Sequence, residues 1–224
     1  MPRVARIYTD EGIFHILARG NNRQWVFKES QDFTVYKGIL KQLKEEQPFK
    51  LYHYCLMSNH IHLMLESNDK TELSRMMKRL NIFYYHHYRK KYGYAGHFWQ
   101  DRFKSLLIED NEYLLACGLY IERNPLRAKI VNAVQQYPYS SYNYYAYGKK
   151  DGLLDRDPYY DSLGKIDKER QAQYRNLTLD SDKNITPKIF NQLFLGTKKF
   201  IEKMEEKFKV SNTRLQRGRP KRVK

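Results

Sequence analysis

Residues 50–66 read KLYHYCLMSNHIHLMLE, two short apolar runs on either side of a Ser58-Asn59 pair. Apolar runs of this length with a polar turn between them predict a β-hairpin. Side chains two residues apart on a strand point to the same face of the sheet. The second strand therefore presents His60 and His62 side by side, and Ile61 points into the core.

The segments around this hairpin complete the predicted fold. Hydrophobic periodicity predicts a strand at 13–19 and a helix at 30–46 ahead of it. A long helix ending near Tyr92, a strand at 102–109 and a helix at 112–123 follow it. The order strand, helix, strand, strand, helix, strand, helix predicts an α+β fold. We expect a ferredoxin-like or RRM-like antiparallel sheet with helices on one face.

The charge of the chain indicates a polyanionic partner. Lys and Arg number 41 against 25 Asp and Glu, for a formal net charge of +16 across 224 residues. Such a field attracts nucleic acid and speeds encounter with it. The 20 tyrosines add rings that can stack on unpaired bases. The sequence therefore predicts a nucleic-acid-binding protein.

Membrane and secretory classes are not expected. The longest uncharged central run, 51–65, is shorter than the ~20 apolar residues that a spanning helix needs. The N-terminal residues lack the apolar segment of a secretory signal. Cys55 and Cys117 stand singly in apolar surroundings, so we expect free thiols in a reducing cytoplasm.

The composition changes after Tyr147 and again near the end of the chain. We expect a main domain at 1–147, a small helical accessory region at 148–210 with helices at 187–195 and 198–209, and a basic tail at 211–224 that is disordered when unbound. Arg217-Gly218-Arg219-Pro220 resembles an AT-hook, whose arginines fit the narrow minor groove of A·T-rich duplex DNA. A nonspecific basic tail is the alternative.

The predicted hairpin and the helix at 112–123 carry side chains suited to metal-assisted chemistry. Two imidazoles on one strand face can hold one divalent ion, although neighbouring strand histidines are often only structural. Tyr120 and Asn124 are four residues apart, hence stacked on one helical face. Glu122 lies about 200° around the helix from Tyr120, which makes it a poor third ligand. The alternative is a buried Tyr120 and an Asn124 that merely ends the helix.

Four segments in this order carry a family resemblance: FHILARGNNR (14–23), MSNHIHLML (57–65), GHFWQDRFKS (96–105) and YIERNPLRA (120–128). They are similar to the REP-associated tyrosine transposases, a branch of the HUH single-tyrosine transposases. The resemblance covers roughly residues 1–147, and it makes that domain an HUH-type catalytic domain.

The resemblance implies a complete catalytic site. His60 and His62 would be the metal-binding pair, Tyr120 the nucleophile and Asn124 the polar ligand that completes the site. Mg²⁺ or Mn²⁺ is the expected metal, because the ion must bind phosphate oxygen and exchange ligands. The family cuts single-stranded DNA next to a small palindromic hairpin in bacterial genomes. Attack by tyrosine would leave a 5′-phosphotyrosine and a free 3′-OH, in a transesterification that needs no ATP.

Further candidates are basic or polar residues expected to contact DNA: Arg3, Arg6, Arg19, Asn21, Asn22, Arg23, Arg102, Arg217 and Arg219. Trp99 either stacks on a base or anchors the core, and the tyrosines of 137–147 either line the DNA path or pack a helix on the sheet. The expected partners are single-stranded or hairpin DNA, with no membrane. We expect a monomer or homodimer in the cytoplasm, associated with the bacterial nucleoid.

Two other functions compete with the nicking enzyme. One is a hairpin-binding regulator that keeps the fold but does not cut. The other is an RNA-binding module with an RRM-like sheet, which would need exposed aromatic side chains on central strands, for which Phe14 and Tyr54 are the candidates. The intact set of His60, His62, Tyr120 and Asn124 favours the enzyme, because binding alone does not require it.

Overall fold

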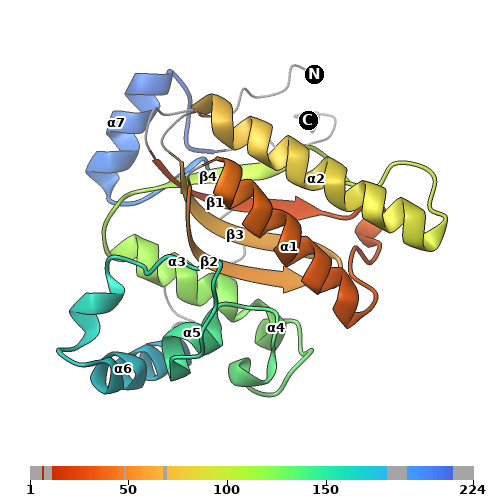
Figure 1. The fold of residues 1–224 in the computed structure, drawn as a ribbon. Helices are drawn as coiled ribbons and strands as arrows, with labels where there is room; N and C mark the ends of the chain where they lie inside the picture. The colour runs from red at the N-terminus through yellow and green to blue at the C-terminus, as the bar shows by residue number, and fades with distance from the viewer. Residues whose placement is uncertain (1–6, 8–11, 48, 68–69, 181–190, 214–224) are drawn as a thin grey trace, which may run out of the picture.

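A five-stranded sheet forms the centre of the molecule (Figure 1), in a computed structural model that describes residues 7, 12–47, 49–67, 70–180 and 191–213. The first four strands are antiparallel, and the fifth runs parallel to its neighbour. The predicted hairpin and the α+β class are confirmed. The strands, in the sheet order β2-β3-β1-β4-β5, are β2 (Lys50–Met57), β3 (His60–Ser67), β1 (Gly12–Arg19), β4 (Lys104–Ile108) and β5 (Phe194–Leu195).

Helices cover both faces of the sheet. On one face, Phe14 and Ile16 of β1 pack under α1 (Ser30–Glu46) and α2 (Lys70–Tyr92). On the other face, Ile13 and Leu17 pack against α3 (Glu112–Glu122). The expectation that all helices share one face was therefore wrong for α3. The helix is apolar around most of its circumference, so it packs on the sheet with one side and on later segments with the other.

The tyrosine-rich segment 137–147 packs against neighbouring helices and strands and does not line an open path for DNA. Its buried rings pack with α3 and α6. The hydroxyl of Tyr137 donates to Leu56 O at 2.6 Å, and that of Tyr145 to Tyr52 O at 2.7 Å. The division of the chain after Tyr147 stays a prediction. The helices after α3 are α4 (Asn124–Arg127), α5 (Tyr142–Tyr147), α6 (Asp167–Asp180) and α7 (Lys198–Phe208).

Residues 193–195, just before α7, are extended where a helix was predicted at 187–195. The described part of that range, 191–195, contains no helical turn of α type and ends in β5. Its backbone binds β4, since Leu107 N donates to Leu193 O at 2.9 Å and Glu109 N to Leu195 O at 2.8 Å. Pairing with an exposed sheet edge outweighs local helical propensity here. The helix predicted at 198–209 is α7, capped by Thr197.

Cys55 and Cys117 are free and buried, as expected. Across the described ranges, no helix has the length and apolar character that crossing a membrane requires.

Candidate active site

β3 places the two predicted ligand histidines on the face that α3 covers. The ring centroids of His60 and His62 are 5.0 Å apart, and Ile61 between them is fully buried on the opposite face. Strand parity thus gives the side-by-side arrangement that the sequence predicted. His60 is the first residue of β3, and its Nδ1 is hydrogen-bonded to Asn59 Oδ1 at 2.5 Å.

α3 brings Tyr120 to the same face. The ring centroid of Tyr120 lies 6.5 Å from that of His62, and the two rings meet edge to face. Tyr120 packs among Leu17, Met64 and neighbouring apolar residues and is 5% exposed. The phenol and the imidazole pair therefore converge within one chain, but the phenol is covered in this conformation.

The histidines are held in the form that binds metal. Burial, with the nearby positive charge of Arg19, lowers the pKa of His60 to about 4, and burial lowers the pKa of His62 well below its usual value. Both imidazoles are therefore neutral near pH 7, as metal ligation requires. Within the described residues, no cluster of three or more His, Cys, Asp or Glu side chains forms a metal site. An ion at the histidine pair would need its further oxygen ligands from an amide, water or phosphate.

Asn124 hydrogen-bonds to the backbone of the helix that carries Tyr120. Its amide nitrogen donates to Tyr120 O at 3.0 Å and to Ile121 O at 2.9 Å, which satisfies carbonyls that the end of α3 leaves open. A metal would take the amide oxygen instead, so the two roles use different atoms of one side chain. The ligand role of Asn124 stays a prediction.

Two arginines surround Tyr120. The guanidinium of Arg127 lies 4.4 Å from the centroid of the Tyr120 ring, and its Nη1 donates to Tyr120 O at 3.0 Å. Burial raises the pKa of the Tyr120 phenol, while the positive charges of Arg127 and Arg19 oppose this shift. The sequence reasoning missed Arg127, although its place on α4, three residues after Asn124, was a signal for it.

The remaining DNA-binding candidates lie around the open end of β1. Arg19 ends that strand opposite His60, and the exposed Asn22 and Arg23 follow in left-handed backbone, with φ of 48° and 58°. Asn21 is half-buried in the same turn, and Arg102 lines a nearby pocket. Trp99 is partly buried, and its Nε1 donates to Asn81 O at 3.2 Å, so it anchors the core. The predicted positions Arg3, Arg6, Arg217 and Arg219 lie outside the described residues.

A third histidine, His15 of β1, contacts the pair. Nε2 of His15 is hydrogen-bonded to Nδ1 of His62 at 2.9 Å, and Sγ of Cys117 lies 3.5 Å from Nδ1 of His15. Burial lowers the pKa of His15 to about 3, so this ring is neutral too. The bond engages Nδ1 of His62. Such a partner commonly orients a metal-binding histidine.

A buried charged cluster holds α3 against β2. His53 is fully buried and contacts Glu122 through Nδ1 and Asp157 through Nε2, both at 2.9 Å. Tyr174 Oη donates to Glu122 Oε2 at 2.7 Å, and Ser141 Oγ donates to Glu122 Oε1 at 2.5 Å. Glu122 therefore faces away from the histidine pair, as its helical position predicted. The sequence analysis missed the contact between Glu122 and His53, because the sequence does not show how α3 is aligned with β2.

Comparisons with known proteins show similarity to transposases. The family model described as "Transposase IS200 like" matches residues 9–124. A Haemophilus influenzae protein that carries the name REP-associated tyrosine transposase is 28% identical over a 157-residue alignment that covers 64% of this chain and 86% of that protein. A solved REP-associated tyrosine transposase bound to a REP hairpin superposes with a TM-score of 0.57 at 17% identity, over 70% of this chain and 98% of that one. The solved structure supports the fold, and the family model ends at Asn124.

Proposed function

The chain belongs to the IS200-like transposase family, and on that premise we propose that it is a metal-dependent single-strand DNA endonuclease and strand transferase with Tyr120 as its nucleophile. The observation that carries this proposal is the meeting of His60 and His62 from β3 with Tyr120 from α3 on one face of the sheet. One chain contributes all three side chains, which supports a site built within a monomer.

The chemistry is a transesterification at phosphorus. Tyr120 Oη attacks the scissile phosphorus, a new P–O bond to tyrosine forms, and the bond from phosphorus to the 3′ oxygen breaks. The phenol proton leaves and the departing 3′ oxygen ends as a hydroxyl, so a 5′-phosphotyrosine and a free 3′-OH result. A second 3′-OH reverses the step and joins strands, because the phosphodiester bond energy is retained.

The expected ion is Mg²⁺ or Mn²⁺, held by His60, His62 and the amide oxygen of Asn124. Bound there, it would polarise phosphate oxygens and offset negative charge as the phosphorus is attacked. The neutral imidazoles fit this role, and His15 supports the orientation of His62.

The guanidinium of Arg127 lies over the Tyr120 ring and is a candidate ligand for the scissile phosphate. The guanidinium lies 4.4 Å from the centroid of the Tyr120 ring, and a guanidinium binds phosphate through charge-assisted hydrogen bonds. We infer that Arg127 exchanges the Tyr120 ring for the scissile phosphate. Arg19, at the end of β1 opposite His60, adds a second positive charge to the site.

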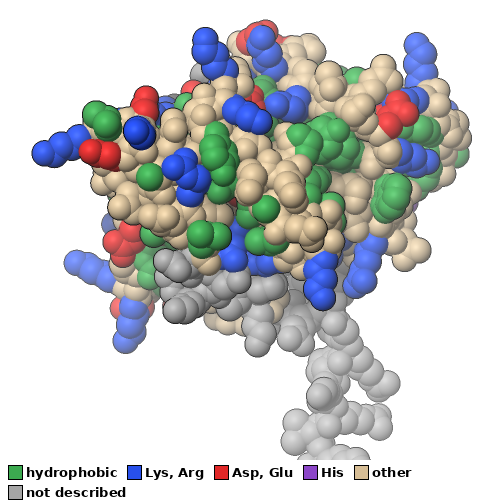
Figure 2. All heavy atoms as spheres, turned by 90° about the horizontal axis from the view of Figure 1, so that it is seen from below, with side chains coloured by type: hydrophobic (Ala, Val, Ile, Leu, Met, Phe, Trp, Pro, Cys, Tyr) green, Lys and Arg blue, Asp and Glu red, His purple; other side chains and the backbone are tan. Residues whose placement is uncertain are grey.

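The substrate is single-stranded DNA next to a hairpin. The solved relative is described as bound to a REP hairpin, and this chain carries a net charge of +16 for a polyanion. Figure 2 shows Lys and Arg side chains spread over the face seen from below, with fewer Asp and Glu among them. Arg3, Arg6 and the tail arginines remain proposed contacts, the tail ones to A·T-rich duplex DNA.

A hairpin-binding regulator without cutting activity is the second candidate, and the covered phenol favours it. The RNA-binding alternative fits less well. Phe14 and Tyr54, the ring residues that an RRM-like platform would expose, are 1% and 2% exposed under α1 and α2.

The test is trapping of a covalent protein–DNA adduct. A hairpin oligonucleotide labelled at its 3′ end is incubated with the full chain and Mg²⁺ or Mn²⁺, and adducts are separated under denaturing conditions. The label reports the strand that stays on tyrosine. We expect an adduct with wild type and with Tyr113→Phe, a matched control on the same helix.

Tyr120→Phe and His60→Ala should give no adduct, and removal of the metal with EDTA should suppress it in wild type. Hairpin binding by Tyr120→Phe without any adduct from wild type would favour the regulator. Equal adduct from Tyr120→Phe and wild type would remove Tyr120 as the nucleophile.

A further inference from the structure

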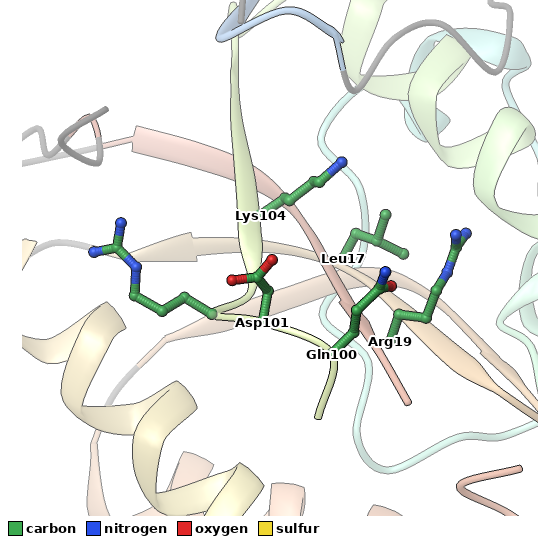
Figure 3. Close-up of a pocket in the computed structure, with 6 residues that line it drawn as sticks. Leu17, Arg19, Gln100, Asp101 and Lys104 are labelled. Carbon is green, nitrogen blue, oxygen red and sulfur yellow. The ribbon is translucent and has the colours of Figure 1, made fainter. Parts of the chain in front are cut away.

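A pocket opens beside the histidine pair, at the ends of β1 and β4 (Figure 3). Strand register places it on the same face as the active-site residues, since Arg19 lies opposite His60 and Leu17 opposite His62. Leu17 also pairs with Lys104 of β4. The pocket is lined by Leu17, Arg19, Gln100, Asp101, Arg102 and Lys104.

The wall that carries Gln100 is held firmly in place. Gln100 N donates to Arg19 O at 2.8 Å, and Asn21 N donates to Phe98 O at 2.8 Å. Gly20 forms a β-bridge with Trp99. A Cβ at Gly20 would lie 2.5 Å from Gln24 O, so the turn after β1 has no room for a larger residue at this position. The backbone on both sides of the pocket is therefore set before any ligand arrives.

The pocket lining combines basic, acidic, amide and apolar side chains. Three cations and one carboxylate give it a net charge of +2, which suits a nucleotide phosphate. An amide and a carboxylate are the side chains that pair with the edges of bases, glutamine with adenine and aspartate with the amino group of cytosine. Leu17 adds apolar surface at the pocket wall, and Figure 3 shows its side chain between those of Lys104 and Arg19.

We propose that this pocket binds one unpaired nucleotide next to the scissile phosphate, and that Gln100 and Asp101 select its base. The proposal rests on the proposed function for the position of the phosphate. It adds a base-selective site that cutting as such does not need. The cations Arg19, Arg102 and Lys104 hold the backbone of that nucleotide.

The test is a binding selection that does not depend on cutting. Full-length protein with Tyr120→Phe is mixed with hairpin oligonucleotides whose single-stranded flanks are randomised, and bound molecules are sequenced. We expect a base preference at one flanking position. Adding Gln100→Ala should reduce that preference by roughly fivefold or more, the discrimination of one good base contact. Gln100→Glu, which replaces a donor with an acceptor, should shift the preferred base.

Gln42→Ala is the matched control, because Gln42 is exposed on α1, over the opposite face of the sheet. It should leave the preference unchanged. Absence of any preference, or the same preference with Gln100→Ala and Gln42→Ala, overturns the inference. If Gln100→Ala lowers the melting temperature, Gln100→Glu provides the same comparison. Failure of the proposed function would appear separately, as absence of the covalent adduct in wild type.

Discussion

Replacement of His53 by Leu should strongly destabilise the protein. His53 lies between Glu122 and Asp157, and all three side chains are fully buried. With His53 protonated, the cluster carries one positive and two negative charges. The change would leave two carboxylates buried without a cation. Breaking a buried pair in this way costs about 3–5 kcal/mol of unfolding free energy.

The pH dependence gives a second estimate of the same interaction. Burial lowers the pKa of His53, but the hydrogen bonds that its ring donates to Asp157 and Glu122 outweigh this effect and raise the pKa to about 9. A rise from 6.5 to about 9 corresponds to about 3 kcal/mol. Because the folded state binds the proton more tightly, this stabilisation is complete below pH 6.5 and is lost as the pH rises through 9.

The assay is urea unfolding of wild type and His53→Leu at several pH values from 6 to 10. Wild type should lose stability across the window from 6.5 to 9, and the variant should lack that loss while being less stable at pH 6. His86→Leu, at an exposed position on α2, should change stability by less than about 0.5 kcal/mol. A cost below about 1 kcal/mol for His53→Leu, or the same pH slope in both proteins, would refute the charged state of this cluster.

Three further changes test other parts of the site. Gly118→Ala puts a methyl group 2.5 Å from the His53 ring and should cost about 1–3 kcal/mol in urea unfolding, whereas Gly38→Ala, with nothing within 4 Å, should be neutral or stabilising; equal effects would contradict the close approach. His15→Leu should weaken Mn²⁺ binding about 10- to 100-fold, measured by electron paramagnetic resonance without DNA, because His62 loses its orienting bond; an unchanged affinity would make His15 merely structural. Asn124→Asp should lower the melting temperature, because the carboxylate cannot donate to Tyr120 O, yet it should keep Mn²⁺ binding, because it retains a ligand oxygen. Asn124→Ala should lower both the melting temperature and the Mn²⁺ affinity. Equal Mn²⁺ affinity in the two variants would remove Asn124 from the metal site.

Local rules were sufficient to predict most of the fold. Side-chain alternation predicted that His60 and His62 share one face of the sheet, and helical spacing predicted that Tyr120 and Asn124 lie one turn apart. The order of strands and helices up to α3 followed from hydrophobic periodicity. These features depend on neighbours within a few residues, so the sequence contains them directly.

Contacts between distant segments could not be predicted in the same way. His15 meets His62 only because β1 lies between β3 and β4, and the register of that pairing is not visible in the sequence. A bulge between Leu51 and His53 shifts the register of β2 just where His53 turns to Glu122. β5 is two residues long and owes its existence to the edge of β4 rather than to its own propensity. Packing decided each of these features.

Mass spectrometry of the trapped adduct tests the central claim most directly. Wild-type protein is reacted with the hairpin oligonucleotide and Mn²⁺, digested with protease and nuclease, and searched for peptides that carry a nucleotide 5′-phosphate. Modification of the peptide that contains Tyr120, at the tyrosine oxygen, is the predicted result. A nucleotide attached to a different residue, with the Tyr120 peptide unmodified, would contradict the account.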